Sequence, residues 1–176
     1  NKKALDAAPL SILPRSKNDP AVTDAMRKSI KGYRVLDYAP VNSALRDPGD
    51  PAKAKTEANI QNLDAAMAAS KLTEPVVTYR GIWSAKLIFG DTGRENLTGV
   101  TWREDAYVST SASQQVATKF ATGPASKRSA VVLRIVAPQG AGGLALSSPS
   151  YEAEILLDRG HDFRVAKDHG IGDDGV

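Results

Sequence analysis

The sequence predicts an α+β fold, with helices first and strands after them. Apolar side chains recur at helical spacing before Pro75, whereas β-branched and aromatic residues are enriched in short segments after it. Helices that precede the strands, rather than alternating with them, are typical of α+β proteins. The 176 residues suit one domain with its own hydrophobic core, and no internal repeat or linker divides residues 1–176.

Three helices are expected in the first part of the chain. Asp19 is a candidate N-cap with Pro20 at the first helical position, and Gly32 is a candidate end for this helix. A second helix fits residues 41–46. The Pro- and Gly-containing segment 47–55 is typical of a loop, and a third helix follows it.

Strand-like segments fill the second part of the chain. They cover residues 76–83, 105–111, 130–138, 151–158 and 163–165. The segment 130–138 is almost continuously apolar, which favours a central strand buried on both faces.

A short helix interrupts these strands. Ser111 and Gln114 have the spacing of a capping box, so Ser111 is expected to cap a helix that runs through Phe120. The Gly123-Pro124 pair then ends the helix.

Composition excludes several classes of protein. The net charge of +3 and the pI of about 9.1 are only mildly basic, and the cations are scattered, unlike those of a nucleic-acid-binding protein. The absence of cysteine excludes disulfides and thiolate metal sites, and His161 and His169 have no metal-ligand spacing. No apolar segment reaches transmembrane length, and no signal-peptide pattern opens residues 1–176, although a targeting signal could lie outside this segment. Since the first residue is Asn1, we expect a domain excised from a longer chain.

Two glutamates stand in the strand-like segment 151–158. In an extended strand alternate side chains share a face, so Glu152 and Glu154 would lie side by side. Taken alone, the pair indicates the exposed face of an ordinary strand. A pair of carboxylates also occurs in glycoside hydrolases, although that chemistry suits carboxylates on separate strands better.

Two further polar positions end predicted strands. Arg80 follows a β-rich segment; alone it indicates a solvated arginine, but a guanidinium at this place also suits an anion such as phosphate. Ser109 belongs to the Ser-Thr-Ser sequence that ends residues 105–111, where it can hydrogen-bond a nearby carboxylate.

The order of these motifs carries more information than any one of them. An arginine at a strand end, then Ser-Thr-Ser, then Glu-x-Glu resembles the mono-ADP-ribosyltransferases of the Arg–Ser–Glu type. This family includes clostridial Rho-modifying exoenzymes, actin-modifying binary toxins and bacterial effectors. The resemblance extends from about Ala25 to Val165 and includes the helical sequence VNSALR at residues 41–46.

The resemblance implies two packed, mainly antiparallel sheets around an NAD cleft, with helices on the N-terminal side. It implies that NAD is the substrate and that no metal takes part. Arg80 would hold NAD near its phosphates and ribose, and the Gly81 backbone would bind the nicotinamide amide. Arg46 would reach the pyrophosphate, and Phe120 would lie against NAD.

The resemblance also implies catalytic roles. Ser109 would orient Glu154, both of them also contacting NAD, and Glu154 would stabilise the oxocarbenium-like ribose that forms as nicotinamide leaves. Glu152 would align the acceptor and draw off its proton. Because family members with glutamine at that position modify asparagine or glutamine, Glu152 indicates an arginine acceptor.

Three other functions use the same residues or the same fold. An NAD glycohydrolase would need no protein acceptor, and the sequence hardly separates it from a transferase. A catalytically inactive binding module is disfavoured by the intact arginine, serine and glutamate set. A transferase acting on nucleic-acid bases is disfavoured by the lack of a stripe of aromatic and basic residues.

The expected partner is therefore a target protein that presents an arginine, with an immunity or chaperone protein as a second candidate. Neither a membrane nor a nucleic acid is expected. The resemblance implies a toxin or effector that is secreted or delivered into a target cell and acts in its cytoplasm.

Overall fold

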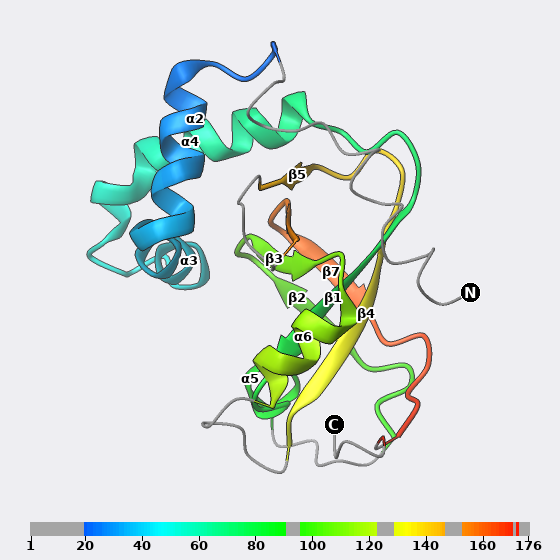
Figure 1. Ribbon diagram of the computed structural model, residues 1–176. Coiled ribbons are helices and arrows are strands. Elements are labelled where there is room, and N and C mark those ends of the chain that lie inside the picture. The colour runs from blue at the N-terminus through cyan, green and yellow to red at the C-terminus, as the bar shows by residue number, and fades with distance from the viewer. Residues whose placement is uncertain (1–19, 91–95, 123–128, 147–152, 171, 173–176) are drawn as a thin grey trace.

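A computed structural model describes residues 20–90, 96–122, 129–146, 153–170 and 172. Helices on the N-terminal side lie over one face of a five-stranded sheet, and a two-stranded sheet lies toward the other face (Figure 1). All strand pairs are antiparallel. The α+β fold class and the two-sheet architecture that the sequence predicts are confirmed.

The first helix begins at another residue than expected but ends at the expected one, Gly32. Helix α2 spans Asp24–Gly32, and Thr23 caps it through a capping box with Met26, so the helix does not begin at Pro20. Asp19, the expected cap, lies outside the described residues. Gly32 ends the α-helix but does not end the helical run. Its φ of −60° and ψ of −48° are helical, and a π-helical turn, Tyr33–Asp37, continues from it.

Two more helices complete the N-terminal side. Helix α3, Tyr38–Arg46, starts three residues earlier than expected. Helix α4, Lys53–Ala69, is the longest of the described helices and presents buried Ile60, Leu63 and Met67 to the core. A stripe at this spacing buries one face of the helix while the opposite face stays in solvent.

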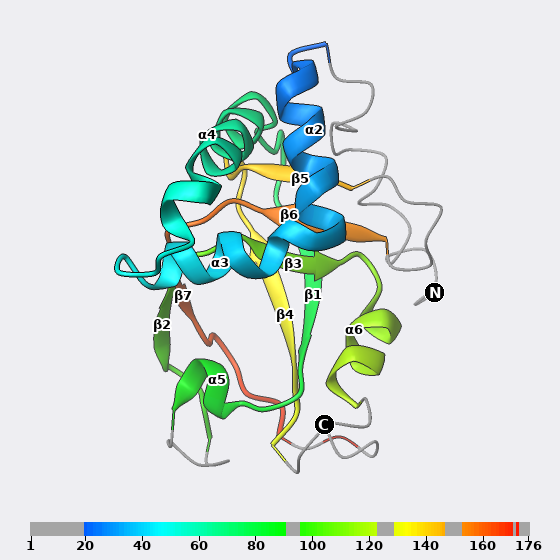
Figure 2. The same ribbon diagram turned by 90° about the vertical axis from the view of Figure 1, so that its left-hand side faces the viewer.

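The strands and short helices follow in chain order after α4. They are β1 (Val76–Ile82), α5 (Lys86–Phe89), β2 (Thr101–Glu104), β3 (Val108–Ser111), α6 (Gln114–Ala121), β4 (Val131–Ala137), β5 (Gly143–Ala145), β6 (Glu154–Leu157) and β7 (His161–Arg164). The larger sheet has the order β4-β1-β3-β6-β5, and β2 pairs with β7 in the smaller one. Strands β1 and β4 run across the direction of β3, β5 and β6 (Figure 2).

The expected central place of the segment 130–138 is wrong. Strand β4 pairs with β1 alone and lies at the edge of the larger sheet. Arg134 and Val136 are exposed, so one face of the strand carries an apolar side chain in solvent. The central strand is β3, which is shorter and carries the Ser-Thr-Ser sequence.

Strand β6 is buried on both faces rather than on one. Leu156 packs in the cluster under the N-terminal helices, whereas Ile155 and Leu157 pack in a second cluster on the opposite face with Phe163 of β7. Leu156 lies on the same face as Glu154 and is covered by the N-terminal helices. The exposed strand face that the sequence predicts is therefore wrong for this strand.

None of the helices in the described ranges combines the length and hydropathy of a membrane-spanning segment.

Candidate active site

A pocket with a volume of about 240 Å³ opens at the middle of the larger sheet. Its lining includes five of the residues that the sequence singles out: Arg80, Gly81, Ser109, Phe120 and Glu154. Tyr79, Thr110, Ser111, Val116 and Ala117 complete the lining. Residues from β1, β3, α6 and β6 therefore meet at one place, although Arg80 and Glu154 are far apart in the chain.

The pocket lies where β1 and β3 diverge. These two strands pair only at Tyr79 and Ser111, whereas β1 pairs with β4 along its whole length. In an antiparallel sheet Gly81 would face Ser109 across the strands, but that pairing is absent. The separation leaves Arg80 and Gly81 on one wall and Ser109 on the other.

Strand register relates Ser109 to Glu154. Ser111 is the direct partner of Glu154, and Ser109 is the partner of Leu156 two residues further along β6. Because side chains at i and i+2 share a face, Ser109 and Glu154 are diagonal neighbours on the same face of the sheet. The geometry is compatible with the orienting role expected for Ser109.

Helix α6 forms the remaining wall, and its cap differs from the expected one. Ser113 is the N-cap and accepts from the Val116 backbone N–H, whereas Ser111 accepts from the Ser113 N–H one step earlier. The helix still runs past Phe120, as expected. The Phe120 ring is 59% exposed at the mouth of the pocket, where a flat ligand can stack against it.

Gly81 allows α6 to approach β1 closely. A Cβ atom at this position would come within 1.8 Å of the Ala117 carbonyl oxygen and 2.8 Å of the Ala121 nitrogen. Any side chain would therefore push α6 away from the strand. This packing is a sufficient reason for glycine here, and the expected contact with nicotinamide stays a prediction.

Arg80 is a desolvated cation on the pocket wall. Burial lowers the pKa of its guanidinium, the charge of Glu104 opposes this shift, and the charge of Arg46 adds to it. Within the described ranges no carboxylate lies close enough to Arg80 for an ion pair. Arg80 is half-buried, and a partly desolvated guanidinium without a direct counter-charge gains most from an anionic ligand.

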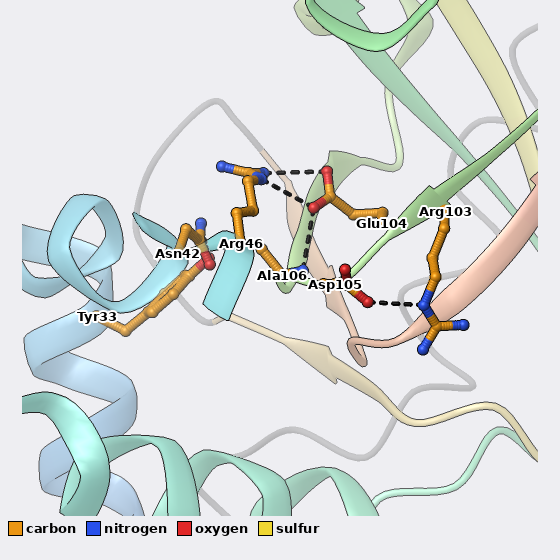
Figure 3. Close-up of polar contacts among 7 residues, drawn as sticks. All are labelled: Tyr33, Asn42, Arg46, Arg103, Glu104, Asp105 and Ala106. Carbon is orange, nitrogen blue, oxygen red and sulfur yellow. Dashed lines mark hydrogen bonds and ion pairs between the residues drawn. The ribbon is translucent and has the colours of Figure 1, made fainter. Parts of the chain in front are cut away.

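Arg46 lies beside this pocket rather than in its lining. At the end of α3 it forms a two-pronged ion pair with Glu104 at the end of β2, with Nε–Oε1 and Nη2–Oε2 distances of 2.9 and 3.0 Å (Figure 3). A second, small cavity is lined by both Arg80 and Glu104. Glu104 thus connects the two arginines that are expected to hold NAD.

Tyr33 is a residue of this region that the sequence analysis missed. Its side chain is buried, Asn42 donates to its hydroxyl oxygen at 2.9 Å, and Ser109 is near enough to lower the pKa of the phenol. Burial raises the pKa of the Tyr33 phenol, and the charges of Glu154 and Arg80 also act on it. The helical spacing of Ile30 and Tyr33 was the available signal, but it indicates only a core position.

The first glutamate of the pair, Glu152, lies outside the described residues. Ala153, between the two glutamates, has a φ of +43°, which is not an extended conformation. The alternation of side chains along a strand therefore does not continue through Ala153. Strand periodicity no longer places Glu152 on the same face as Glu154. The acceptor-aligning role of Glu152 stays a prediction that rests on the resemblance.

Comparison with known proteins identifies the family. The family model for the ADP-ribosyltransferase exoenzyme matches residues 3–175, which is nearly the whole chain. The chain belongs to the ADP-ribosyltransferase exoenzyme family. The family that the sequence resembles is thereby confirmed, and the enzyme class of this family is the expected one, an ADP-ribosyltransferase that uses NAD.

Individual relatives agree with this membership. The NAD(+)--arginine ADP-ribosyltransferase EFV of Enterococcus faecalis is 29% identical over 142 residues, which are 78% of this chain and 28% of that protein. The chain thus spans less than a third of the length of this curated relative.

Solved structures of ADP-ribosyltransferase toxins share the fold. Plx2a, an ADP-ribosyltransferase toxin from Paenibacillus larvae, superimposes with a TM-score of 0.70 at 23% identity, covering 94% of this chain and 87% of Plx2a. Exoenzyme S from Pseudomonas aeruginosa, solved in complex with human 14-3-3 protein beta and bound to carba-NAD, superimposes with a TM-score of 0.69 at 23% identity. The match covers 92% of this chain and 74% of the exoenzyme S chain.

No cluster of three potential metal ligands occurs in the part of the chain that the structure describes.

Proposed function

We propose that this protein transfers ADP-ribose from NAD to an arginine of a target protein, as a bacterial toxin or effector. The observation that carries the proposal is the single pocket that gathers Arg80, Ser109 and Glu154 from three different strands. Family membership supplies the ADP-ribosyl transfer, and the name of the Enterococcus faecalis relative supports arginine as the acceptor.

NAD binding rests on charge and shape. Arg80 offers a desolvated guanidinium to the pyrophosphate and ribose, and Arg46 approaches from the end of α3 with the N–H groups that Glu104 does not use. The exposed ring of Phe120 stacks against NAD, and the backbone of Gly81 binds the nicotinamide amide.

The first chemical step is cleavage of the bond between nicotinamide and ribose. The electron pair of this C–N bond leaves with the nicotinamide, which becomes neutral, and positive charge develops on the ribose. The carboxylate of Glu154 stabilises this charge, and Ser109 holds the carboxylate in place. Tyr33 lies close to Ser109 on the helical side, where Asn42 holds its hydroxyl group.

The second step is attack by the acceptor. An arginine side chain is protonated and is a poor nucleophile, so one of its N–H protons must leave as the new C–N bond forms. Glu152 accepts this proton and aligns the guanidinium. The glutamates thereby divide the reaction, Glu154 acting on NAD and Glu152 on the acceptor.

We further propose that residues 1–176 act as one catalytic domain, delivered to the cytoplasm of a target cell. The chain corresponds to 28% of the length of its curated relative, so other segments of a full-length protein can supply delivery. The partner is a protein with an accessible arginine.

The division of roles is tested by following both products. The wild-type protein is incubated with NAD and a cell lysate, released nicotinamide is measured, and modified residues are located by mass spectrometry. We expect ADP-ribose on arginine, and we expect Glu152→Ala to abolish this transfer while nicotinamide release persists. Release without any protein adduct from the wild type would instead indicate an NAD glycohydrolase, and adducts on another residue type would contradict arginine as the acceptor.

A further inference from the structure

Glu104 is held at a fixed place between the helices and the strands. It is the last residue of β2 and is buried, with its side chain only 10% exposed. Its Oε1 atom also accepts from the Ala106 backbone N–H at 3.0 Å, two residues further along the chain. A carboxylate with this backbone bond and little access to solvent has little freedom to reorient.

The partner of Glu104 is an arginine that would otherwise be mobile. The Arg46 side chain is 47% exposed, and in Figure 3 its guanidinium lies across the carboxylate of Glu104. The two bonds use two of the five N–H groups of the guanidinium, and no other described residue accepts from the remaining three. Those three donors stay available for an anion.

Glu104 also acts on the second arginine. It lines the same small cavity as Arg80, and its charge opposes the effect of burial on that guanidinium. Arg46 and Arg80 carry like charges and repel each other. For this reason the charge of Arg46 lowers the pKa of Arg80. The carboxylate between them compensates for part of this repulsion.

We propose that Glu104 is a positioning residue for NAD, acting through Arg46: its carboxylate holds the guanidinium in the orientation that meets the pyrophosphate. This inference rests on the proposed function. Glu104 itself does not touch NAD, since its carboxylate and the phosphates are both negative and would repel each other.

Glu104 has two opposing effects on the affinity for NAD. The negative charge of Glu104 weakens the attraction for phosphate, whereas pre-ordering Arg46 removes the entropy cost of fixing a long side chain upon binding. We assign the larger effect to the pre-ordering, because Arg46 is half-exposed and its charge is screened by water.

The test compares Glu104→Gln with a matched control, Asp105→Asn. Glutamine keeps the shape of the side chain and the acceptor oxygen for Ala106, but it has an NH2 group in place of the second oxygen, so it cannot accept from both Nε and Nη2 of Arg46 in a fork. The neighbouring Asp105 pairs with Arg103 at 2.7 Å on the exposed side, as Figure 3 shows, and its variant removes the same charge without reaching Arg46. NAD affinity is measured by calorimetry, and KM and kcat by nicotinamide release.

We expect Glu104→Gln to raise KM for NAD and weaken binding about tenfold, which corresponds to about 1.4 kcal/mol. We expect kcat to stay within about twofold, because the transition-state contacts of Glu154 are unchanged. Asp105→Asn should behave like the wild type. Arg46→Lys, which keeps the charge but not the fork, should lose about as much affinity as Glu104→Gln.

The double variant decides whether Glu104 acts through Arg46. If it does, Glu104→Gln combined with Arg46→Lys is no weaker in NAD binding than either single variant. Losses that multiply in the double variant, or an unchanged or lowered KM in Glu104→Gln, would overturn the inference while leaving the proposed function intact. A wild-type protein that does not bind NAD would instead contradict the proposed function itself. Should Glu104→Gln fail to fold, Glu104→Asp, which keeps the charge but withdraws the carboxylate from Arg46, takes its place with the same expected rise in KM.

Discussion

At the scale of single residues, Arg80 dominates the electrostatics of the pocket. Its guanidinium has lost most of its solvation, and Glu104 balances it only from a distance. Such a charge costs stability in the free protein and is favourable only when an anion is bound. Arg80 therefore suits an anionic ligand better than it suits the stability of the free protein.

This conflict predicts the behaviour of Arg80→Gln. We expect NAD affinity to fall at least tenfold, because the fork to phosphate oxygens is lost. The midpoint of thermal unfolding should stay equal to that of the wild type or rise, because a desolvated charge is removed. Calorimetry measures both quantities. As a control, Arg134→Gln on the exposed face of β4 should change neither. A large loss of thermal stability in Arg80→Gln would show that Arg80 has a structural role that this account lacks.

The residues of the site were predictable to different degrees. The ordered appearance of Arg80, Ser109 and Glu154 indicated the pocket, because these residues belong to strands whose sequence is itself strand-like. Tyr33 and Glu104 could not be predicted, because their contacts depend on how α2, α3 and β2 pack and no local pattern records that packing. Their functional roles are proposals that variants must test.

At the scale of elements, an ion pair fastens α4 to the sheet. Asp64 on α4 binds Arg159 through two bonds of 2.8 and 2.6 Å, and the Tyr107 hydroxyl donates to the same carboxylate at 2.7 Å. Tyr107 is buried and also contacts the ring of Tyr33 edge-on, at a distance of 5.8 Å between ring centres. The contacts among Asp64, Arg159 and Tyr107 therefore support the helices that hold Tyr33 near Ser109.

Asp64 makes part of the stability depend on pH. Burial alone would raise the pKa of Asp64, but the hydrogen bonds from Arg159 and Tyr107 and the charge of Arg159 together hold it below its usual value. A carboxyl group whose pKa is lowered in the folded state contributes stability above its unfolded pKa, near 4. That contribution is lost as the pH falls through the folded value.

We therefore expect Asp64→Asn to lower the free energy of unfolding by about 1–2 kcal/mol near neutral pH. The difference from the wild type should shrink in acid, as the pH falls through the lowered pKa of Asp64 and the carboxyl group becomes protonated in the folded wild type too. Chemical denaturation near neutral pH and in acid measures this. Asp24→Asn, at an exposed position with a loose pair to Arg27 at 3.5 Å, is the control and should show little effect. A difference that is equal at both pH values would contradict the assignment.

Element boundaries were harder to predict than element types. Helix α2 ends at Gly32, as expected, but the chain continues into a π-helical turn, because α2 and α3 on either side of this turn both pack against α4. Ser111 and Ser113 both have cap chemistry, and the structure uses Ser113. The apolar sequence of β4 suggested a central strand, but apolar composition does not fix strand order in an antiparallel sheet.

At the scale of the whole molecule, the larger sheet is the middle one of three layers, and the pocket opens within it. The N-terminal helices bury one face of this sheet and the smaller sheet lies against the other. The divergence of β1 and β3 opens the pocket, which β1, β3, β6 and α6 line. Sequence periodicity predicted the order of helices and strands. It did not predict the divergence of β1 and β3. This divergence arises because β1 stays paired with β4 along its length, whereas β3 stays paired with β6.

The central claim is that this pocket transfers ADP-ribose to arginine and that Glu154 is required. The most direct measurement is the transfer of labelled ADP-ribose from NAD to polyarginine by three proteins: the wild type, Glu154→Ala, and Glu57→Ala on the exposed face of α4. The account predicts transfer by the wild type and by Glu57→Ala, and a loss of at least 100-fold, on the order of 3 kcal/mol in the barrier, for Glu154→Ala. Transfer by Glu154→Ala at the wild-type rate would contradict it.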